Sequence, residues 1–385
     1  MEKLRRGLIL LLILLSCCVE PYNIKSSTYQ QVLVVEGFIS TDLKEHQVTI
    51  SRTSPINQPE FIPETGAQVS IKDGNSLIPL TESSPGIYLT PPVKGVVGDV
   101  YTLYITTQSG QQIVSDEVTL KDTPDIKDVY ATYSTNIGGS GQAGVQIFLN
   151  TEDPTQTSKF YRWDYIETWE IQTPFESEFI WLGGNNVAFR DISVSTCWSS
   201  DTSNNILIQS TQGLSGDKIT AQLIQTIPDG SASMRVMYSI LIRQYALSES
   251  AYLYWQTLKK INESQGTLYD TQPGTVVGNL TSLNSSSTVL GYFDAGVIKE
   301  QRAFFSPKDF SAAGYIPPDY ESICTLFTPT QVPSDQIGAF FAQPGSQGFE
   351  IWGASGAGPS TLFLLPKFCC DCTTLGTNIK PAFWP

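Results

Sequence analysis

The sequence predicts an all-β protein, and three observations support that fold class. Aromatic residues make up 11% of the chain, charged residues only 16%, and there are 30 Gly and 23 Pro, a composition typical of short strands and turns. Many segments alternate apolar and polar residues, and turn-forming residues separate them. Only one segment has clear helical spacing. Because 385 residues exceed what one core usually holds, we expect two folded domains.

The first domain is predicted over residues 29–122. Its expected strands are the alternating segments at residues 31–40, 46–52, 67–73, 86–90, 100–106 and 113–120. So many short strands in one stretch are typical of an immunoglobulin-like β-sandwich.

A larger β-rich domain is predicted over residues 123–385, after a proline among charged residues at 121–129. Strands are expected at residues 143–150, 160–171, 234–248, 287–305 and 348–353, with a break at 294–296. Loop insertions near residues 173–233 and 306–332 and a Cys-rich C-terminal tail complete this decorated β-sandwich.

The strand at residues 160–171 carries an aromatic stripe. A period of two places Tyr161, Trp163, Tyr165, Glu167 and Trp169 on one face. Aromatic residues at strand spacing usually pack in a core, so we interpret the stripe as core, with Glu167 as its exception.

The predicted helix covers residues 249–262, with Ser248 as its N-cap. Ala251, Tyr254, Trp255 and Leu258 have the i, i+3, i+4, i+7 spacing of one helix face.

Residues 1–16 have the pattern of an export signal. Lys3, Arg5 and Arg6 precede the apolar run GLILLLILL, which is too short for a permanent membrane span. Leu14, Leu15 and Ser16 before Cys17 resemble the lipobox of a bacterial lipoprotein. We therefore expect Cys17 to be the acylated first residue of the mature protein, followed by a tether over residues 17–28. A plain secreted protein is the alternative.

The formal net charge of −14 argues against nucleic acid as a partner. The single histidine, His46, excludes a His-based metal site, and we expect no metal and no cofactor.

The remaining cysteines indicate an oxidising compartment. Besides Cys18, the candidates for disulfides are Cys197, Cys324, Cys369, Cys370 and Cys372. The motif FCCDC lacks the paired spacing of a zinc ribbon. We expect one or two disulfides that tie this tail to Cys197 or Cys324, with a metal or redox centre as the alternative; the sequence does not fix the pairing.

Two motifs resemble known signatures, one for dinucleotide binding and one for a catalytic serine, but the neighbouring sequence does not fit either site. Gly139, Gly141 and Gly144 match GxGxxG, with Asp164 twenty residues later, but a strand rather than a helix is expected to follow. We interpret the glycines as a hairpin loop. The stretch GASGA at residues 353–357 nearly matches a nucleophile elbow, but no base is expected nearby.

Acidic and aromatic residues suggest weaker alternatives. Glu167, Glu170, Glu176 and Glu178 could supply a glycosidase pair, although carboxylates on solvated strand edges are commoner. Trp169, Trp181 and Trp198 are candidate ligand-contact aromatics, with Trp169 and Trp181 able to stack on sugar rings.

The chain resembles an uncharacterised family of Bacteroidota outer-membrane lipoproteins, domain of unknown function 4249. The matching pieces extend to the last residue: LVVEGFIST, GAQVSI, GIYL, YRWDYIETWEI with Cys197, YSILIRQYALSESAYLYWQ, VVGNLTS, VLGYFDAG and CCDCTTLGTNIKPAFWP. The resemblance implies an outer-membrane address and genetic neighbourhood with TonB-dependent receptors. It implies no catalytic residues.

We therefore expect a non-enzymatic lipoprotein held in the outer-membrane bilayer by acylated Cys17, at the cell surface rather than the periplasmic face. Its expected role is that of accessory subunit to a TonB-dependent β-barrel, by cargo capture, capping or handover. A free glycan- or protein-binding or adhesion module is the alternative.

Overall fold

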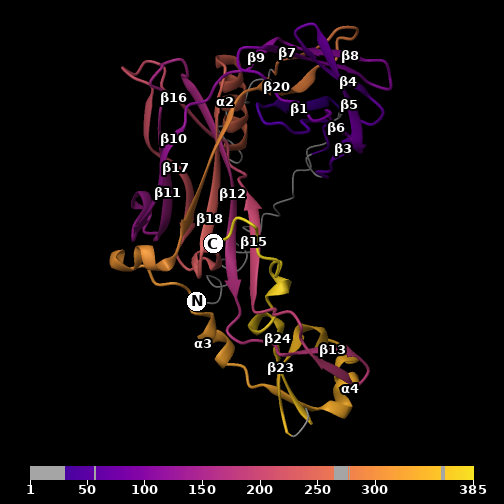
Figure 1. The fold of residues 1–385 in the computed structure, drawn as a ribbon, viewed down its shortest axis with the longest axis vertical. Helices are drawn as coiled ribbons and strands as arrows, with labels where there is room; N and C mark the ends of the chain where they lie inside the picture. Colours follow the sequence, from indigo (N-terminus) through magenta and orange to yellow (C-terminus); the bar gives the residue numbers. More distant parts are fainter. Residues whose placement is uncertain (1–30, 56–57, 264–275, 277, 357–359) are drawn as a thin grey trace, which may run out of the picture.

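The computed structural model describes residues 31–55, 58–263, 276, 278–356 and 360–385. The chain is mostly β, with 47% of residues in strands and 15% in helices, which confirms the predicted fold class. The chain forms three units, which we call the N-terminal, central and distal units. The N-terminal unit lies beside the upper end of the central unit, and the distal unit lies beyond its lower end (Figure 1). Among the described residues, no helix has the length and apolarity needed to cross a membrane. Cys17 and Cys18 lie outside the described residues.

The N-terminal unit is one continuous sheet path that surrounds an apolar core. Its strand order is β19-β8-β7-β4-β5-β6-β2-β1-β20, with β3 and β9 paired at the sides. The strands from the first part of the chain are β1 (Leu33–Ile39), β2 (Gln47–Arg52), β3 (Ile62–Pro63), β4 (Gln68–Asp73), β5 (Ser76–Ser84), β6 (Ile87–Leu89), β7 (Val100–Thr106), β8 (Gln112–Ser115) and β9 (Val118–Thr119). The alternating segments of the sequence therefore form strands, while an immunoglobulin-like arrangement stays a prediction.

Two strands of this unit come from much later in the chain. β19 (Leu280–Ser282) pairs with β8, and β20 (Val289–Ala295) pairs in parallel with β1. The structure thus differs from the predicted division, because the sheet is not built from residues 29–122 alone. At Gly291, φ is +106° and an added Cβ would lie 1.8 Å from the carbonyl oxygen of Val35, so β1 and β20 can approach only because this residue has no side chain.

The side chain of Asn279 also holds the inserted strand β20 in the N-terminal unit. Its buried side-chain amide donates to the carbonyl oxygen of Phe293 at 2.8 Å, and its side-chain oxygen accepts from the Phe293 N–H at 2.9 Å. Both backbone groups are thereby paired inside the core.

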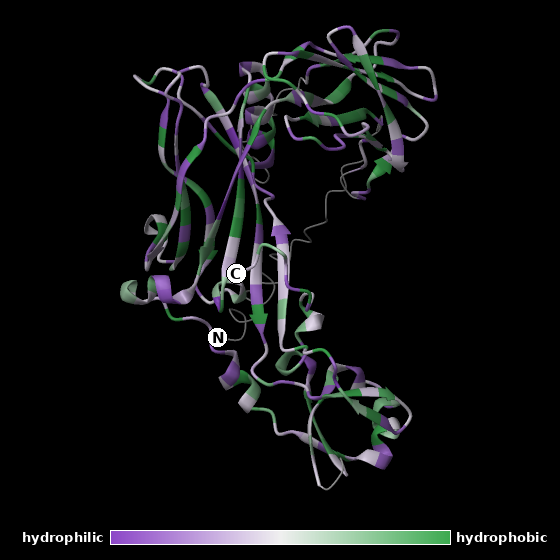
Figure 2. Ribbon diagram, viewed as in Figure 1, coloured by the Kyte–Doolittle hydropathy of each residue, from purple (hydrophilic) through white to green (hydrophobic). Residues whose placement is uncertain are grey.

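The central unit packs two sheets around a second core. One sheet contains β10 (Ile126–Ser134), β11 (Gly144–Glu152) and β17 (Lys218–Pro228). The other contains β12 (Phe160–Gln172), β15 (Thr196–Thr202), β16 (Leu207–Ser210), β18 (Tyr238–Ala246) and β21 (Ile298–Phe305). Hydrophobic and hydrophilic residues alternate along these strands (Figure 2). β15, β16 and the whole of β17 lie within residues 173–233, where the sequence indicated a loop insertion.

The aromatic stripe of β12 is core, as predicted. Tyr161, Trp163 and Tyr165 are buried between the two sheets, and Trp169 packs partly buried against them. Gly139 and Gly141 lie in the connection between the antiparallel strands β10 and β11, which confirms the hairpin interpretation.

The predicted helix is α2 (Glu249–Glu263). The Ser248 hydroxyl accepts from the Ala251 N–H at 3.1 Å, as expected of an N-cap. Ala251 and Tyr254 are buried, and the helix packs between the N-terminal and central units through the apolar cluster that they share with Phe38, Tyr245 and Tyr292.

The distal unit is small. It contains the hairpin β13 (Phe179–Gly183) and β14 (Asn186–Phe189), the sheet β22 (Thr330–Pro333), β24 (Thr361–Pro366) and β23 (Phe349–Ser355), and the short helices α3 (Tyr320–Thr325) and α4 (Ile337–Phe341). The 3-10 turns of the described residues are η1 (Ile137–Gly139), η2 (Ala232–Met234), η3 (Pro307–Ala313), η4 (Ser334–Gln336), η5 (Ser346–Gly348), η6 (Lys367–Cys369) and η7 (Cys372–Thr374), of which η4 and η5 belong to the distal unit.

Two disulfides hold the C-terminal tail, as the sequence indicated. Cys197 of β15 pairs with Cys372, and Cys324 of α3 pairs with Cys369. Cys370, also a predicted disulfide candidate, differs: it is a buried free thiol, because its neighbour Cys369 takes the partner on α3. Burial raises the pKa of the Cys370 thiol to about 12, so the group stays protonated.

Candidate functional site

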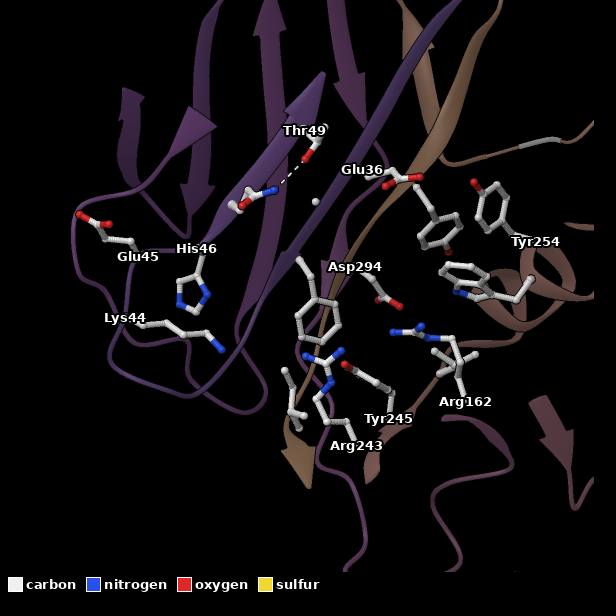
Figure 3. Close-up of a pocket in the computed structure, with 17 residues that line it drawn as sticks. Glu36, Lys44, Glu45, His46, Thr49, Arg162, Arg243, Tyr245, Tyr254 and Asp294 are labelled. Carbon is white, nitrogen blue, oxygen red and sulfur yellow. Dashed lines mark hydrogen bonds between the residues drawn. The ribbon is translucent and has the colours of Figure 1, made fainter. Parts of the chain in front are cut away.

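The main candidate site is a cleft of about 530 Å³ where the N-terminal unit meets the central unit, which we call the interunit cleft (Figure 3). β1, β20 and the turn before β2 form one wall, and β12, β18 and α2 form the other. Its volume falls in the range of small-molecule sites, and boundaries between folded units commonly hold such sites.

Two arginines and one carboxylate come from adjacent strands. Register pairs Asp164 of β12 with Arg243 of β18, and Arg162 with Tyr245, on the face opposite the aromatic core stripe. Arg243 Nε forms an ion pair with Asp164, and Arg162 lies 3.3 Å from the same carboxylate. One partly buried carboxylate therefore orients two guanidinium groups toward the cleft.

Aromatic rings fix Arg162 further. Its guanidinium lies 4.1 Å from the centroid of Tyr245 and 4.7 Å from that of Trp255 on α2, a double cation–π contact. Burial raises the pKa of Tyr245 and of Tyr254 to about 12. Both phenols are neutral at physiological pH and can donate hydrogen bonds.

Asp294 of β20 extends its carboxylate into the cleft toward Arg162 (Figure 3). Burial raises its pKa to about 6, although the Ala295 N–H at 2.9 Å and the charges of Arg162 and Lys121 act in the opposite direction. This carboxyl group titrates close to physiological pH.

His46 is a structural residue, consistent with its rejection as a catalytic base. Its Nδ1 accepts from the Ser40 N–H at 3.4 Å, and its Nε2 donates to the carbonyl oxygen of Val93 at 3.1 Å. The ring is 2% exposed, and burial lowers its pKa. Both nitrogens are engaged, and the neutral tautomer fits these partners.

The charges that line the cleft balance. Its cations are Lys44, Arg162 and Arg243, and its carboxylates are Glu36, Glu45 and Asp294. With the aromatic rings, these groups offer hydrogen-bond donors, acceptors and apolar surface together. Such a lining suits a polar ligand without net charge, neutral or zwitterionic, that has an apolar face. No group of three or more His, Cys, Asp or Glu that could hold a metal occurs in the part of the chain that the structure describes.

The predicted ligand-contact tryptophans do not meet in this cleft. Trp198, a candidate ligand-contact residue, is only 9% exposed, and its ring contacts Trp384 of the C-terminal tail instead. Its indole N–H is buried without a partner among the described residues. Trp169 packs against the central core, and Trp181 stacks on Phe341 with its N–H donated to Gly184.

The four glutamates that could have supplied a glycosidase pair lie in two separate places. Glu167 and Glu170 are three residues apart on β12 and so on opposite faces. Glu167 accepts from Tyr238 and Gln225, and Glu170 accepts from Trp384 at 3.1 Å, so each has a structural partner. Glu176 and Glu178 do come together, at a separate cavity of the distal unit.

Sequence reasoning missed the polar residues of the cleft. Arg243 interrupts an almost continuous apolar strand, and Asp294 follows the apolar segment VLGYF. A charge inside a buried strand is costly unless it is paired or functional, and this signal was available.

Comparison with known proteins gives one result. The model of the family described as Domain of unknown function (DUF4249) matches residues 19–302, a span that includes every residue lining the interunit cleft. No curated protein matches the chain. The chain belongs to the family described as Domain of unknown function (DUF4249).

Proposed function

We propose that this protein is a non-enzymatic outer-membrane lipoprotein that serves as accessory subunit to a TonB-dependent receptor, and that its interunit cleft captures a small polar ligand. Capping of the barrel and handover of cargo are the two roles that such a subunit can have. Acylated Cys17 would hold the protein in the bilayer, at the cell surface rather than the periplasmic face.

The location rests on the first residues of the sequence. A basic and apolar segment ends in Leu14, Leu15 and Ser16 before Cys17, the pattern on which a lipid is attached to the cysteine sulfur. Several acyl chains together give stable anchoring, since each buried methylene contributes about 0.8 kcal/mol.

The binding role rests on the interunit cleft. Arg162 and Arg243 are held in place by Asp164 and, for Arg162, by two aromatic rings. Side chains fixed before a ligand arrives lose little entropy when they bind it. The balance of charge around the cleft supports a ligand of zero net charge, such as a sugar or a short peptide.

Co-purification tests the partner. The tagged protein is extracted from its own outer membranes in mild detergent, alongside a Cys17→Ala variant, and associated proteins are identified by mass spectrometry. We expect a stoichiometric β-barrel with the wild-type protein that is lost with the variant. A lone lipoprotein would contradict the accessory role and favour the free glycan- or protein-binding module.

Array screening tests the cleft. Glycan and oligopeptide arrays are probed with the wild-type protein and with Arg243→Gln and Asp294→Asn. Arg52→Gln is the control, because Arg52 pairs with Glu64 outside the cleft. We expect a ligand whose binding both cleft variants weaken and the control does not. Equal binding by all four proteins would exclude the cleft as the binding site.

A further inference from the structure

The distal unit contains a second cavity of about 530 Å³ on the outer face of its three-stranded sheet, which we call the distal cavity. Ile351, Leu362 and Leu364 point to the other face and are fully buried in the distal core. Trp352 and Phe363 line the cavity. Their ring centroids are 6.4 Å apart and their planes meet at 65°, so the rings form two walls of a corner.

Glu176 and Glu178 supply the polar side of the cavity. They flank buried Ser177, whose hydroxyl donates to the carbonyl oxygen of Ile351 at 2.7 Å. Because side chains alternate along an extended chain, Glu176 and Glu178 lie on the side of this segment opposite Ser177. Ser193 donates to Glu176 at 2.9 Å and fixes that carboxylate further.

This geometry is rigidly supported. Arg190 donates from Nε to the Ser177 hydroxyl at 3.0 Å and forms an ion pair with Glu350 at 2.7 Å. The ring of Trp352 packs 5.5 Å from that of Phe175. The Phe175 N–H donates to the carbonyl oxygen of Cys369, which is bonded to Cys324. A disulfide and a buried ion pair therefore hold the aromatic and acidic sides in register.

The charge of the distal cavity is one-sided, unlike that of the interunit cleft. None of the described residues that line it is a cation. Neither Glu176 nor Glu178 forms an ion pair with a described residue. Two unpaired carboxylates beside two aromatic rings attract a cation, through charge on one side and through the ring quadrupoles on the other.

We propose that the distal cavity is a docking site for an arginine or lysine side chain presented by a partner polypeptide. The cation lies against Trp352 and Phe363 and donates to Glu176 and Glu178, while the amide of Gln331 accepts or donates to the peptide that carries it. The net charge of −14 steers a basic partner toward this surface. The proposal does not depend on what the interunit cleft binds.

Fluorine NMR tests this site on the full mature protein labelled with 5-fluorotryptophan. Trp352→Phe identifies the resonance of Trp352. The probe is the capped tripeptide Gly-Arg-Gly, and its matched control carries citrulline, which has nearly the same shape as arginine but no charge. We expect a saturable shift of the Trp352 resonance with the arginine peptide, weakened by salt, and none with the citrulline peptide.

Variants assign the response to the carboxylates. Glu178→Gln weakens binding about fivefold, and the double variant with Glu176→Gln removes the saturable shift. Glu178 is exposed, so its replacement leaves the fold intact. Glu60→Gln changes the charge equally at an exposed position of the N-terminal unit and leaves binding unchanged.

Three outcomes overturn the proposal: no saturable shift with the arginine peptide, an equal shift with citrulline, or unchanged binding by the double variant. A shift with neutral oligosaccharides but not with the arginine peptide would assign the cavity to sugar and overturn it as well.

Discussion

The N-terminal unit surrounds a core of 19 buried apolar residues, whereas the distal core has seven. The larger core includes no cysteine. The distal unit has the Cys324–Cys369 disulfide and the Arg190–Glu350 ion pair beside its core. A small unit buries too little apolar surface to be stable alone, and covalent links replace what the core lacks. One chain therefore uses two means of stabilisation: the N-terminal unit gains core residues from inserted strands, and the distal unit is crosslinked by a disulfide.

The largest effect is expected from Gly291→Ala in the N-terminal unit. The new Cβ would overlap the carbonyl oxygen of Val35, so β20 must separate from β1, at a cost of about 4 kcal/mol or more in the free energy of unfolding. Hydrogen exchange with mass spectrometry would show lost protection in β1 and β20.

Gly98→Ala is the control for that variant. Gly98 also has positive φ, +93°, but nothing lies within 4 Å of an added Cβ. The Gly98→Ala variant therefore measures the cost of backbone strain alone, about 1 kcal/mol in the free energy of unfolding. Equal losses in the two variants would contradict the role of close strand approach.

Removing its disulfide tests how the distal unit is stabilised. Replacing both Cys324 and Cys369 by Ser opens a loop of 45 residues, which corresponds to about 4 kcal/mol by chain entropy, although measured values are often smaller. We expect hydrogen exchange to rise in β22, β23 and β24 while the N-terminal unit keeps its protection. Uniform loss of protection across both units would show that they do not differ in this way.

Asn279→Ala tests the insertion by a smaller change. It leaves the buried N–H and carbonyl oxygen of Phe293 unpaired, at a cost of about 3 kcal/mol. Asn284→Ala is the matched control, because Asn284 also bonds two backbone groups, those of Gln112 and Gly110, but at the surface. Urea unfolding compares them, and a loss below about 1 kcal/mol is expected for the control.

The smallest expected effect concerns Asp294 at the boundary between the N-terminal and central units. Burial raises its pKa from the ordinary 3.8 to about 6. The folded protein therefore binds this proton more tightly than the unfolded chain, and the stability from this group is full below about pH 4 and lost as pH rises through about 6.

Asp294→Asn removes that dependence. We expect the variant to match the wild type near pH 4 and to be about 2 kcal/mol more stable near pH 7.5, after allowance for partial exposure. Urea unfolding at the two pH values measures the difference in stability between variant and wild type. An equal difference at both pH values would contradict the raised pKa of Asp294.

Local patterns predicted the elements whose residues decide their own structure. The cap and apolar face of α2 and the alternating strand β12 are of this kind. The pairing of β20 with β1 was not predictable, because parallel partners are chosen by contacts far apart in sequence. β15 and β16 were missed because their Ser, Thr and Asp residues resemble loop sequence, although both strands pair with β12.

The candidate sites were also not predictable where they depend on contacts between residues far apart in the sequence. Arg162 and Asp164 could be placed on one strand face, but the approach of Arg162 to Asp294 depends on the insertion of β20. The sequence identified Glu176 and Glu178, but not the aromatic walls that Trp352 and Phe363 form beside them.

The parallel pairing of β1 with β20 also has a consequence for folding. β1 begins at Leu33, and its parallel neighbour β20 ends at Ala295, so most of the chain separates the two paired strands. Pairing across such a separation is slow, because the entropy of closing the loop is lost before the contacts form. We therefore expect the edge of β1 that pairs with β20 to be among the last parts of the protein to become native, and a chain interrupted before residue 295 would lack a complete N-terminal unit.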